Sequence, residues 1–176
     1  MAENDNVVSL GRKIFFLHPS VLVRNQIIAE LAQEEFEAYT AKDEGKLRQV
    51  LKKYSDSIVF ANINDGMKES EWEVWIRAVM GDSQMSGVDI GVIASAEDAN
   101  LRRKYAEQLK LRCGYTVLKS ELSVMLKQLM DILNGVNAKG RRKYIRALTD
   151  TETNTTINLP MNGTFINGII KKPYRG

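Results

Sequence analysis

The feature that most constrains the fold is a repeated alternation of short apolar runs and helical periods over the first 135 residues. Each apolar run is followed by apolar residues at the three- and four-residue spacing of an amphipathic helix. Runs with almost no polar positions are typical of strands buried on both faces. The runs lie at residues 14–17, 35–41, 57–61, 88–94 and 115–118, and the more polar 35–41 run is expected nearer an edge. The pattern predicts an α/β fold with a five-stranded, doubly wound parallel sheet over residues 12–135.

Helix boundaries are marked by residues that satisfy or end a helical hydrogen-bond ladder. We expect Ser20 and Ser95 to cap the helices that follow the first and fourth strands. Ser70 and Glu73 have the spacing of a capping box, which predicts a helix start at this point. Gly135 is well placed to end the last helix.

The charge is divided unevenly, although the whole chain of 176 residues carries a formal net charge of only +3. Residues 1–135 contain 17 basic and 20 acidic residues, whereas residues 136–176 contain 8 basic and 2 acidic residues. So abrupt a change of sign favours two units with different partners. We expect a flexible N-terminus at 1–11, the α/β domain at 12–135, a basic linker at 136–146 and a short β segment at 147–176. Asn-Gly pairs at 162–163 and 167–168 predict hairpin turns in this last segment.

Several function classes lack support in the sequence. Cys113 and His18 are the single residues of their kinds, so an intramolecular disulfide and a zinc cluster are both excluded. No apolar run approaches the length of about 20 residues that spans a membrane, and no signal peptide is visible, so a cytoplasmic location is the default expectation. The motifs GxGxxG, GxxxxGK(S/T) and GxSxG are absent, and we expect no enzymatic activity, no catalytic residues, no bound metal and no cofactor.

The first 135 residues resemble a response-regulator receiver domain, which has a flavodoxin-like fold. The segment VIASA at 92–96 places Ser95 where a receiver has its hydroxyl residue after strand four. The segment TVLKS at 116–120 likewise places Lys119 where a receiver has its lysine after strand five. The two residues could equally be a helix cap and a surface lysine.

The chain departs from the receiver pattern where a receiver carries its carboxylates. The acidic pair after strand one, which holds Mg²⁺, is replaced by Leu17, His18 and Pro19. The phosphoryl-accepting aspartate at the end of strand three is replaced by Ala61 or Asn62, and Asp65 comes a few residues too late. The resemblance is therefore to a degenerate receiver that cannot be phosphorylated, with His18 as a loop or capping residue.

A basic run at 141–146 contains Arg141, Arg142, Lys143 and Arg146. One interpretation is a solvated basic linker. The other interpretation uses the RxxxR spacing of Arg142 and Arg146, because guanidinium groups bind phosphate in a bidentate manner and stack on planar rings.

This tail resembles the beginning of a PilZ domain, a bacterial receptor for cyclic di-GMP. That family opens with RxxxR, here RKYIR at 142–146, and continues into β-hairpins, here TTINLPMNGTFINGII at 155–170. The resemblance implies that Arg142 and Arg146 bind the guanine bases and phosphates of cyclic di-GMP, with Arg141 adding charge. The family's second motif, (D/N)xSxxG, does not follow within the sequence, so we expect only the N-terminal part of a PilZ domain here.

Two functional hypotheses follow. The first is a non-enzymatic bacterial signalling protein that binds cyclic di-GMP through its RxxxR linker and carries a phosphorylation-incompetent receiver-like domain. The alternative is a protein–protein adaptor that uses the face of its last helices and strand and binds no nucleotide. We expect no DNA binding. A homodimer resting on Trp72 and Trp75 is conceivable, but tryptophans at this spacing more often pack in a core.

Overall fold

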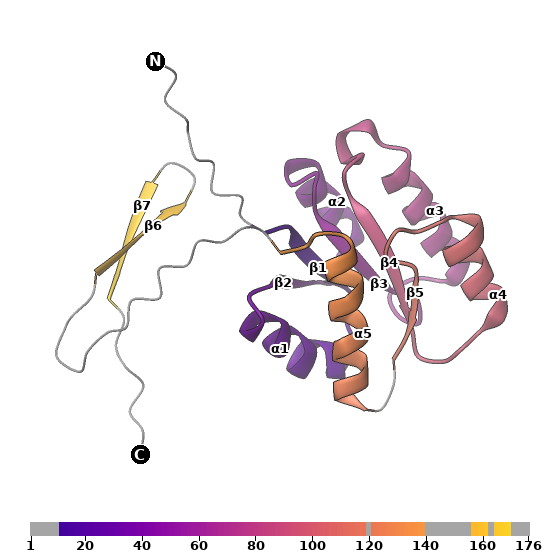
Figure 1. The fold of residues 1–176 in the computed structure, drawn as a ribbon. Helices are drawn as coiled ribbons and strands as arrows, with labels where there is room; N and C mark the ends of the chain where they lie inside the picture. Colours follow the sequence, from indigo (N-terminus) through magenta and orange to yellow (C-terminus); the bar gives the residue numbers. More distant parts are fainter. Residues whose placement is uncertain (1–10, 119–120, 140–155, 162–163, 170–176) are drawn as a thin grey trace. The chain divides into compact units, whose positions relative to one another are not determined.

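The computed structural model describes residues 11–118, 121–139, 156–161 and 164–169. The chain divides into two compact units, Met1–Arg142 and Lys143–Gly176. The described part of the first unit is an α/β domain, and that of the second is a pair of strands (Figure 1).

The first unit contains a five-stranded sheet in which every pairing is parallel. The strand order is β2-β1-β3-β4-β5, which confirms the predicted fold class. Both central strands, β3 and β4, are buried at every position, whereas edge strand β2 is partly exposed, as its polar sequence predicts. The strands are β1 (Lys13–Leu17), β2 (Glu37–Ala41), β3 (Ile58–Asn62), β4 (Asp89–Ala94) and β5 (Tyr115–Val117).

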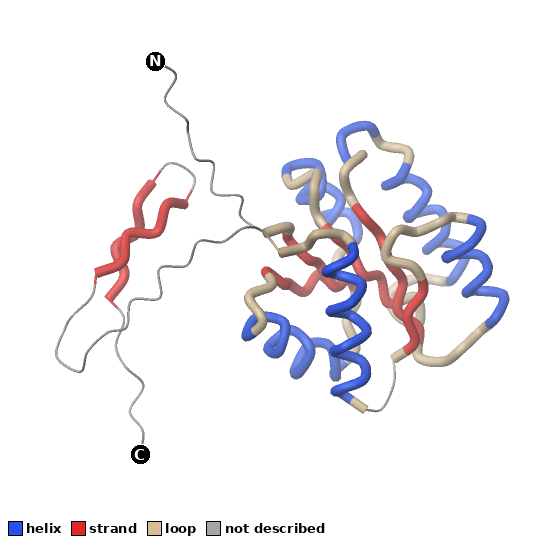
Figure 2. Tube along the Cα trace, in the orientation of Figure 1, coloured by secondary structure: helices blue, strands red, loops and turns tan. Residues whose placement is uncertain are grey.

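Helices cover both faces of this sheet (Figures 1 and 2). One face is covered by a π-helical turn, η1 (Val23–Ile27), its continuation α1 (Ile28–Gln33), and α5 (Leu122–Gly135). The other face is covered by α2 (Glu44–Lys53), α3 (Glu69–Met80), and α4 (Ala99–Arg102) continuing into η3 (Arg103–Gln108), with the short 3-10 turn η2 (Ser83–Met85). Among the described residues, no helix is both long and apolar enough to cross a membrane.

Side chains alternate between two cores because successive residues of a strand point to opposite faces. Ile14 and Phe16 of β1 pack in the core beneath α1 and α5, and Phe15 and Leu17 pack in the core beneath α2, α3 and η3. Trp72 lies in the second core and is fully buried. Its ring is therefore unavailable for the homodimer contact that the sequence left open.

Two helix starts differ from the prediction. Helix α3 begins at Glu69, before Ser70, and the backbone N–H of Lys68 donates to the Glu71 carboxylate at 2.8 Å. Ser70 therefore lies inside the first turn and is not the cap. Helix α4 is capped by Asp98, whose Oδ1 accepts from the backbone of Asn100 and Leu101, and not by Ser95. In both places a nearby carboxylate satisfies the free amides and displaces the expected hydroxyl.

Ser20 does cap the first helix, because its Oγ accepts from the Val23 backbone N–H at 3.3 Å. Helix α5 does not end at Gly135 in the way that the sequence predicts. Gly135 is the last helical residue, and the positive φ of 53° is taken by Asn137. The N–H of Asn137 donates to Asn134 O, and that of Ala138 donates to Leu133 O, which together form a Schellman motif.

The second unit contains an antiparallel pair, β6 (Thr156–Met161) and β7 (Thr164–Ile169). Met161 pairs with Thr164, so the strands flank the Asn-Gly pair at 162–163 as a hairpin signal predicts. The second Asn-Gly pair is not a turn, because Asn167 and Gly168 lie within β7 opposite Asn158 and Ile157. Continued strand pairing overrides the local turn preference at this position.

Candidate functional site

The loops at the carboxyl ends of the strands meet, as the parallel topology requires. His18 follows β1, Asn62 ends β3 and Ser95 follows β4. The Asn62 side-chain Nδ2 donates to His18 O at 2.8 Å, and the Ser95 backbone N–H donates to Asn64 Oδ1 at 2.6 Å. This edge contains the residues that the receiver resemblance singles out, except Lys119, which lies outside the described residues.

His18 is held in an unusual backbone conformation. Its φ is 51°, a region that residues other than glycine seldom occupy. Its backbone N–H donates to Ala41 O at 2.8 Å, and its ring Nε2 lies 2.5 Å from Glu44 Oε1 at the start of α2. The residue thus joins the ends of β1 and β2 to the beginning of α2.

The imidazole is packed from two further sides. Gly66 has a φ of 80°, and a Cβ at this position would lie 2.5 Å from His18 Cδ2 and Nε2. The Trp72 ring meets the imidazole edge-on, with ring centroids 5.9 Å apart, and the Trp72 indole N–H donates to Asp65 O at 3.1 Å. The His18 side chain therefore fills the space between the loops at this edge and is only 15% exposed.

Asn62 is the last residue of β3 and one of the two candidates, with Ala61, for the position of a receiver's acceptor aspartate; it is 8% exposed. Both ends of its amide are engaged, because Nδ2 donates to His18 O and Oδ1 accepts from the Asn64 backbone N–H at 3.2 Å. Asp65 is exposed, and its Oδ1 accepts from the Gly66 backbone N–H at 2.7 Å. The uncharged amide of Asn62 therefore links the loop after β1 to the loop after β3.

These residues do not fit the Mg²⁺ that the receiver resemblance implies. Divalent Mg²⁺ is held by carboxylate and other oxygen ligands. The imidazole of His18 and the engaged amide of Asn62 occupy the corresponding positions, and Glu44 is paired with His18. Over the described residues, no group of three or more His, Cys, Asp or Glu side chains could hold a metal ion.

The other predicted site residues are placed as follows. Ser95 is exposed, and its backbone rather than its hydroxyl makes the contact with Asn64. The proposed cyclic di-GMP ligands Arg141, Arg142 and Arg146 all lie outside the described residues. Their role stays a prediction.

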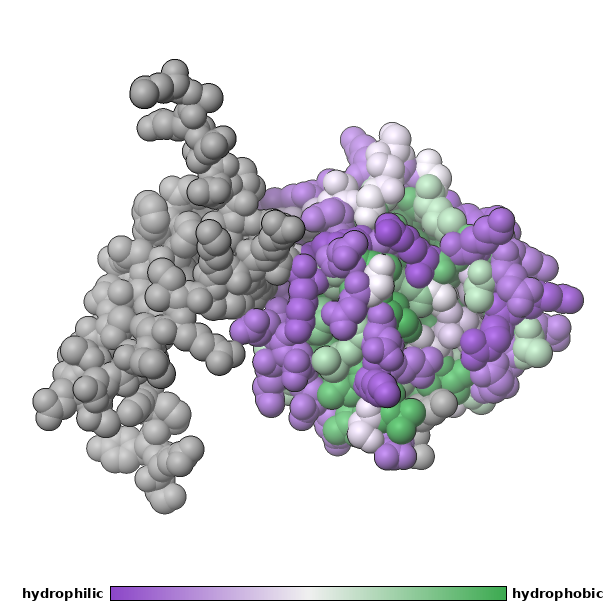
Figure 3. Space-filling view, viewed as in Figure 1, coloured by the Kyte–Doolittle hydropathy of each residue, from purple (hydrophilic) through white to green (hydrophobic). Residues whose placement is uncertain are grey.

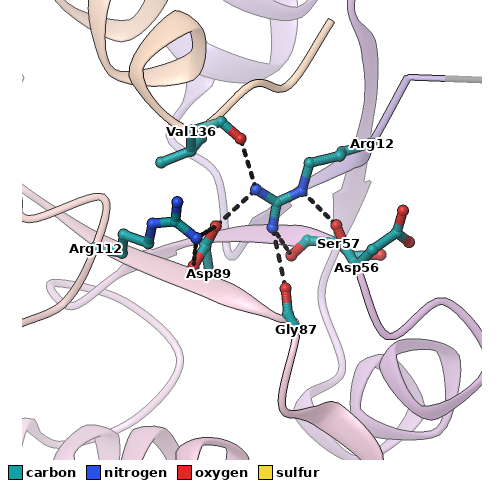
Figure 4. Close-up of polar contacts among 7 residues, drawn as sticks. All are labelled: Arg12, Asp56, Ser57, Gly87, Asp89, Arg112 and Val136. Atoms are coloured by element: carbon teal, nitrogen blue, oxygen red, sulfur yellow. Dashed lines mark hydrogen bonds and ion pairs between the residues drawn. The ribbon is translucent and has the colours of Figure 1, made fainter. Parts of the chain in front are cut away.

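At the opposite edge of the sheet, Arg12 makes a dense polar network that the sequence did not reveal (Figure 4). Its guanidinium donates to Asp89 Oδ2 at 2.6 Å and to the carbonyls of Asp56, Gly87 and Val136 at 2.5, 3.1 and 2.8 Å. Its backbone N–H also donates to Ala138 O. The cation therefore binds the carboxyl end of α5, where the helix dipole is negative.

Arg112 shares Asp89 with Arg12, at 3.3 Å to Oδ2. Asp89 is 8% exposed, so one nearly buried carboxylate compensates two guanidinium groups. The sequence signal was slight, since an arginine just before a buried strand is indistinguishable from a surface residue.

The α/β domain is similar to receiver domains of known structure. The chemotaxis response regulator CheY4 of Vibrio cholerae superposes with a TM-score of 0.56 at 17% identity, covering 70% of this chain and 99% of that chain. A CheY-like response regulator receiver domain protein from Methanospirillum hungatei JF-1 gives a TM-score of 0.51 at 20% identity, covering 70% of this chain and 95% of that chain. A response regulator protein from Burkholderia multivorans gives 0.51 at 18% identity, with the same coverages of 70% and 95%.

No family model and no curated protein matches the sequence. At these identities the structural likeness establishes the receiver-type fold, in agreement with the resemblance drawn from residues 92–96 and 116–120. The PilZ resemblance of residues 142–170 stays a prediction.

Proposed function

We propose that this chain is a non-enzymatic signalling protein whose receiver-type domain works without phosphorylation. The observation that carries the proposal is Asn62, a neutral side chain at the acceptor position with both ends of its amide hydrogen-bonded. A carboxamide is a poor nucleophile, because its nitrogen lone pair is delocalised and its oxygen carries no full charge. The imidazole of His18 packs against Glu44, Gly66 and Trp72 at the same loop edge.

The proposed input is cyclic di-GMP, bound by Arg142 and Arg146 with Arg141 adding positive charge. Support comes from the RxxxR spacing and from the hairpin β6–β7 that follows it. Guanidinium groups suit this ligand because they bind phosphate oxygens in pairs and stack on guanine rings. Binding would restrict the segment that joins the two units and so favour one set of contacts with a partner protein.

Calorimetric titration of the full chain with cyclic di-GMP tests this proposal. We expect saturable binding, and we expect Arg142→Ala and Arg146→Ala each to weaken the affinity about tenfold or more, because each removes charge-assisted hydrogen bonds. Lys172→Ala is the matched control, since it removes a positive charge from the C-terminal basic part of the chain outside the RxxxR motif. Absence of binding, or equal losses in all three variants, would contradict the proposal.

An adaptor that binds no nucleotide is the second candidate. It is favoured by a groove of about 690 Å³ lined by residues of η3, β5 and α5, on the face that this hypothesis assigns to the partner. Limited proteolysis distinguishes the two candidates. An adaptor should be cut between residues 139 and 146 at the same rate with and without cyclic di-GMP, whereas a receptor should be protected by it.

A further inference from the structure

A smaller groove, of about 440 Å³, lies between α2 and α3. These two helices cover the face of the sheet opposite to α1 and α5 (Figure 1). On the face that carries α5, polar side chains interrupt the apolar surface (Figure 3), whereas the groove between α2 and α3 has a mainly apolar lining. Its volume is in the usual range for binding sites.

Trp75 lines the groove and is held in one orientation. Its indole N–H donates to Glu44 O, at the start of α2, at 3.4 Å. Its ring meets the Trp72 ring edge-on, with centroids 6.1 Å apart, and packs with Met67 against the core beneath α2 and α3. A tryptophan fixed in this way loses little conformational freedom when another surface packs against it, which favours association.

Val74 stands beside Trp75 with its side chain in solvent. It is 69% exposed, more than any other large hydrophobic residue in the described part of the chain. A branched side chain at an exposed helical position is a poor helix former, so the isolated domain gains little from it. Ser70 and Ala78 lie four residues before and after Val74 and also line the groove. These small neighbours allow a second surface to approach α3 closely.

The two sides of the groove carry opposite charges. On the α2 side, Arg48 is 40% exposed and lies 3.6 Å from Asp82 Oδ2, a distance typical of a loose ion pair. On the α3 side, Glu71 Oε2 accepts from the Lys68 backbone N–H, and among the described residues Glu71 Oε1 has no partner. A two-fold axis along the groove would bring the α2 side of one copy onto the α3 side of another. The groove is therefore complementary in charge to a second copy of itself.

We propose that this groove is an interface between two copies of the chain, related by a two-fold axis along the groove. Val74 of each copy packs in the groove of the other against Trp75, and Arg48 of each copy pairs with Glu71 of the other. The sequence left open a homodimer through both tryptophans. Trp72 is fully buried, but Trp75 is partly exposed in this groove. The small groove predicts a weak dimer whose population rises with concentration.

Sedimentation velocity of the full chain, from about 10 to about 500 μM, tests the interface. We expect the sedimentation coefficient to rise with concentration, and we expect Val74→Glu to weaken the association about tenfold or more, because it buries a charge in an apolar contact. Val21→Glu is the matched control, since Val21 is 62% exposed just before η1, on the opposite face of the sheet. A chain that stays monomeric over the whole range, or equal weakening by both variants, would overturn the proposal.

The pairing of Arg48 with Glu71 is tested by exchanging charges between copies. Arg48→Glu alone and Glu71→Arg alone should each weaken self-association about tenfold, because like charges then face each other across the axis. An equimolar mixture of the two variants should associate again, since each copy then meets the opposite charge in the other. Loss of the Glu71 contact with Lys68 within one chain would not be repaired by mixing. A mixture that associates no better than the separate variants would overturn the proposed pairing.

The inference goes beyond the proposed function. None of these variants changes Arg142 or Arg146, so failure of the dimer is distinguishable from failure of cyclic di-GMP binding.

Discussion

At the scale of single residues, His18 is the centre of the loop edge. It carries a φ of 51°, and its backbone N–H and C=O bind Ala41 and Asn62 respectively. Such a conformation persists in a residue with a side chain only where the surroundings determine it. Here the ring contacts with Glu44 and Gly66 add to the two backbone bonds.

Gly66→Ala tests whether the imidazole fills this site tightly. The new Cβ would meet the His18 ring at 2.5 Å and would also sit at a positive φ, so we expect a loss of about 2–4 kcal/mol in the free energy of unfolding. Gly114→Ala is the control, because Gly114 has a φ of 65° with nothing within 4 Å. It should lose only about 1–2 kcal/mol. Equal losses in urea unfolding would show that the ring can move aside.

Arg12 gives a second prediction at this scale. Arg12→Ala removes the closer partner of nearly buried Asp89 and the donor to several carbonyls, so we expect a loss of about 3 kcal/mol in the free energy of unfolding. Arg112→Ala should cost less than about 1 kcal/mol, because its side chain is 63% exposed and its contact with Asp89 is longer. Chemical unfolding of both variants at one pH makes the comparison. A larger loss for Arg112→Ala would reverse the assigned roles.

At the scale of elements, α3 and η3 are joined by a cluster around Glu69. Its Oε1 accepts from the Tyr105 hydroxyl at 2.9 Å and lies 2.8 Å from Lys104 Nζ. Burial, together with the hydrogen bond to Glu69, raises the pKa of Tyr105 well above its ordinary value. Tyrosinate could not donate this bond, so ionisation of Tyr105 opposes the packing of η3 on α3.

Ionisation of Tyr105 lowers the free energy of unfolding at alkaline pH. The folded-state pKa of Tyr105 lies above the unfolded value of about 10, so its contribution to stability is complete below pH 10 and is lost as the pH rises further. Tyr105→Phe should cost about 1 kcal/mol at neutral pH through the lost hydrogen bond. It should then show a shallower fall of stability above pH 10 than the unmodified chain. Urea unfolding between pH 7 and alkaline pH measures both slopes, and parallel curves would refute the assignment.

The sequence predicts the strands more accurately than the ends of the helices. The apolar runs predict all five strands to within about two residues, because burial on both faces leaves little freedom in composition. Ser20 was also identified correctly as a cap. The caps at Asp98 and Lys68, and the positive φ of Asn137, could not be chosen from sequence, since several neighbouring residues were chemically suitable.

At the scale of the whole molecule, the absence of carboxylates after β1 and at the end of β3 was readable from Leu17-His18-Pro19 and Asn62. The packing of His18 in place of those carboxylates could not be read from the sequence. It depends on Glu44, Gly66 and Trp72, which are distant in sequence and meet only in the fold. The Arg12 network was invisible for the same reason.

The central claim is that a receiver-type fold operates here without a phosphoryl group. Intact-protein mass spectrometry after incubation with acetyl phosphate and Mg²⁺ tests it most directly, with a receiver domain that retains its acidic pair and acceptor aspartate treated in parallel. That receiver domain should gain one phosphoryl group, whereas this chain should show no gain in mass, because the engaged amide of Asn62 replaces the nucleophile. A gain of one phosphoryl group on this chain would contradict the account, and loss of that gain in Asp65→Asn would identify Asp65 as the acceptor.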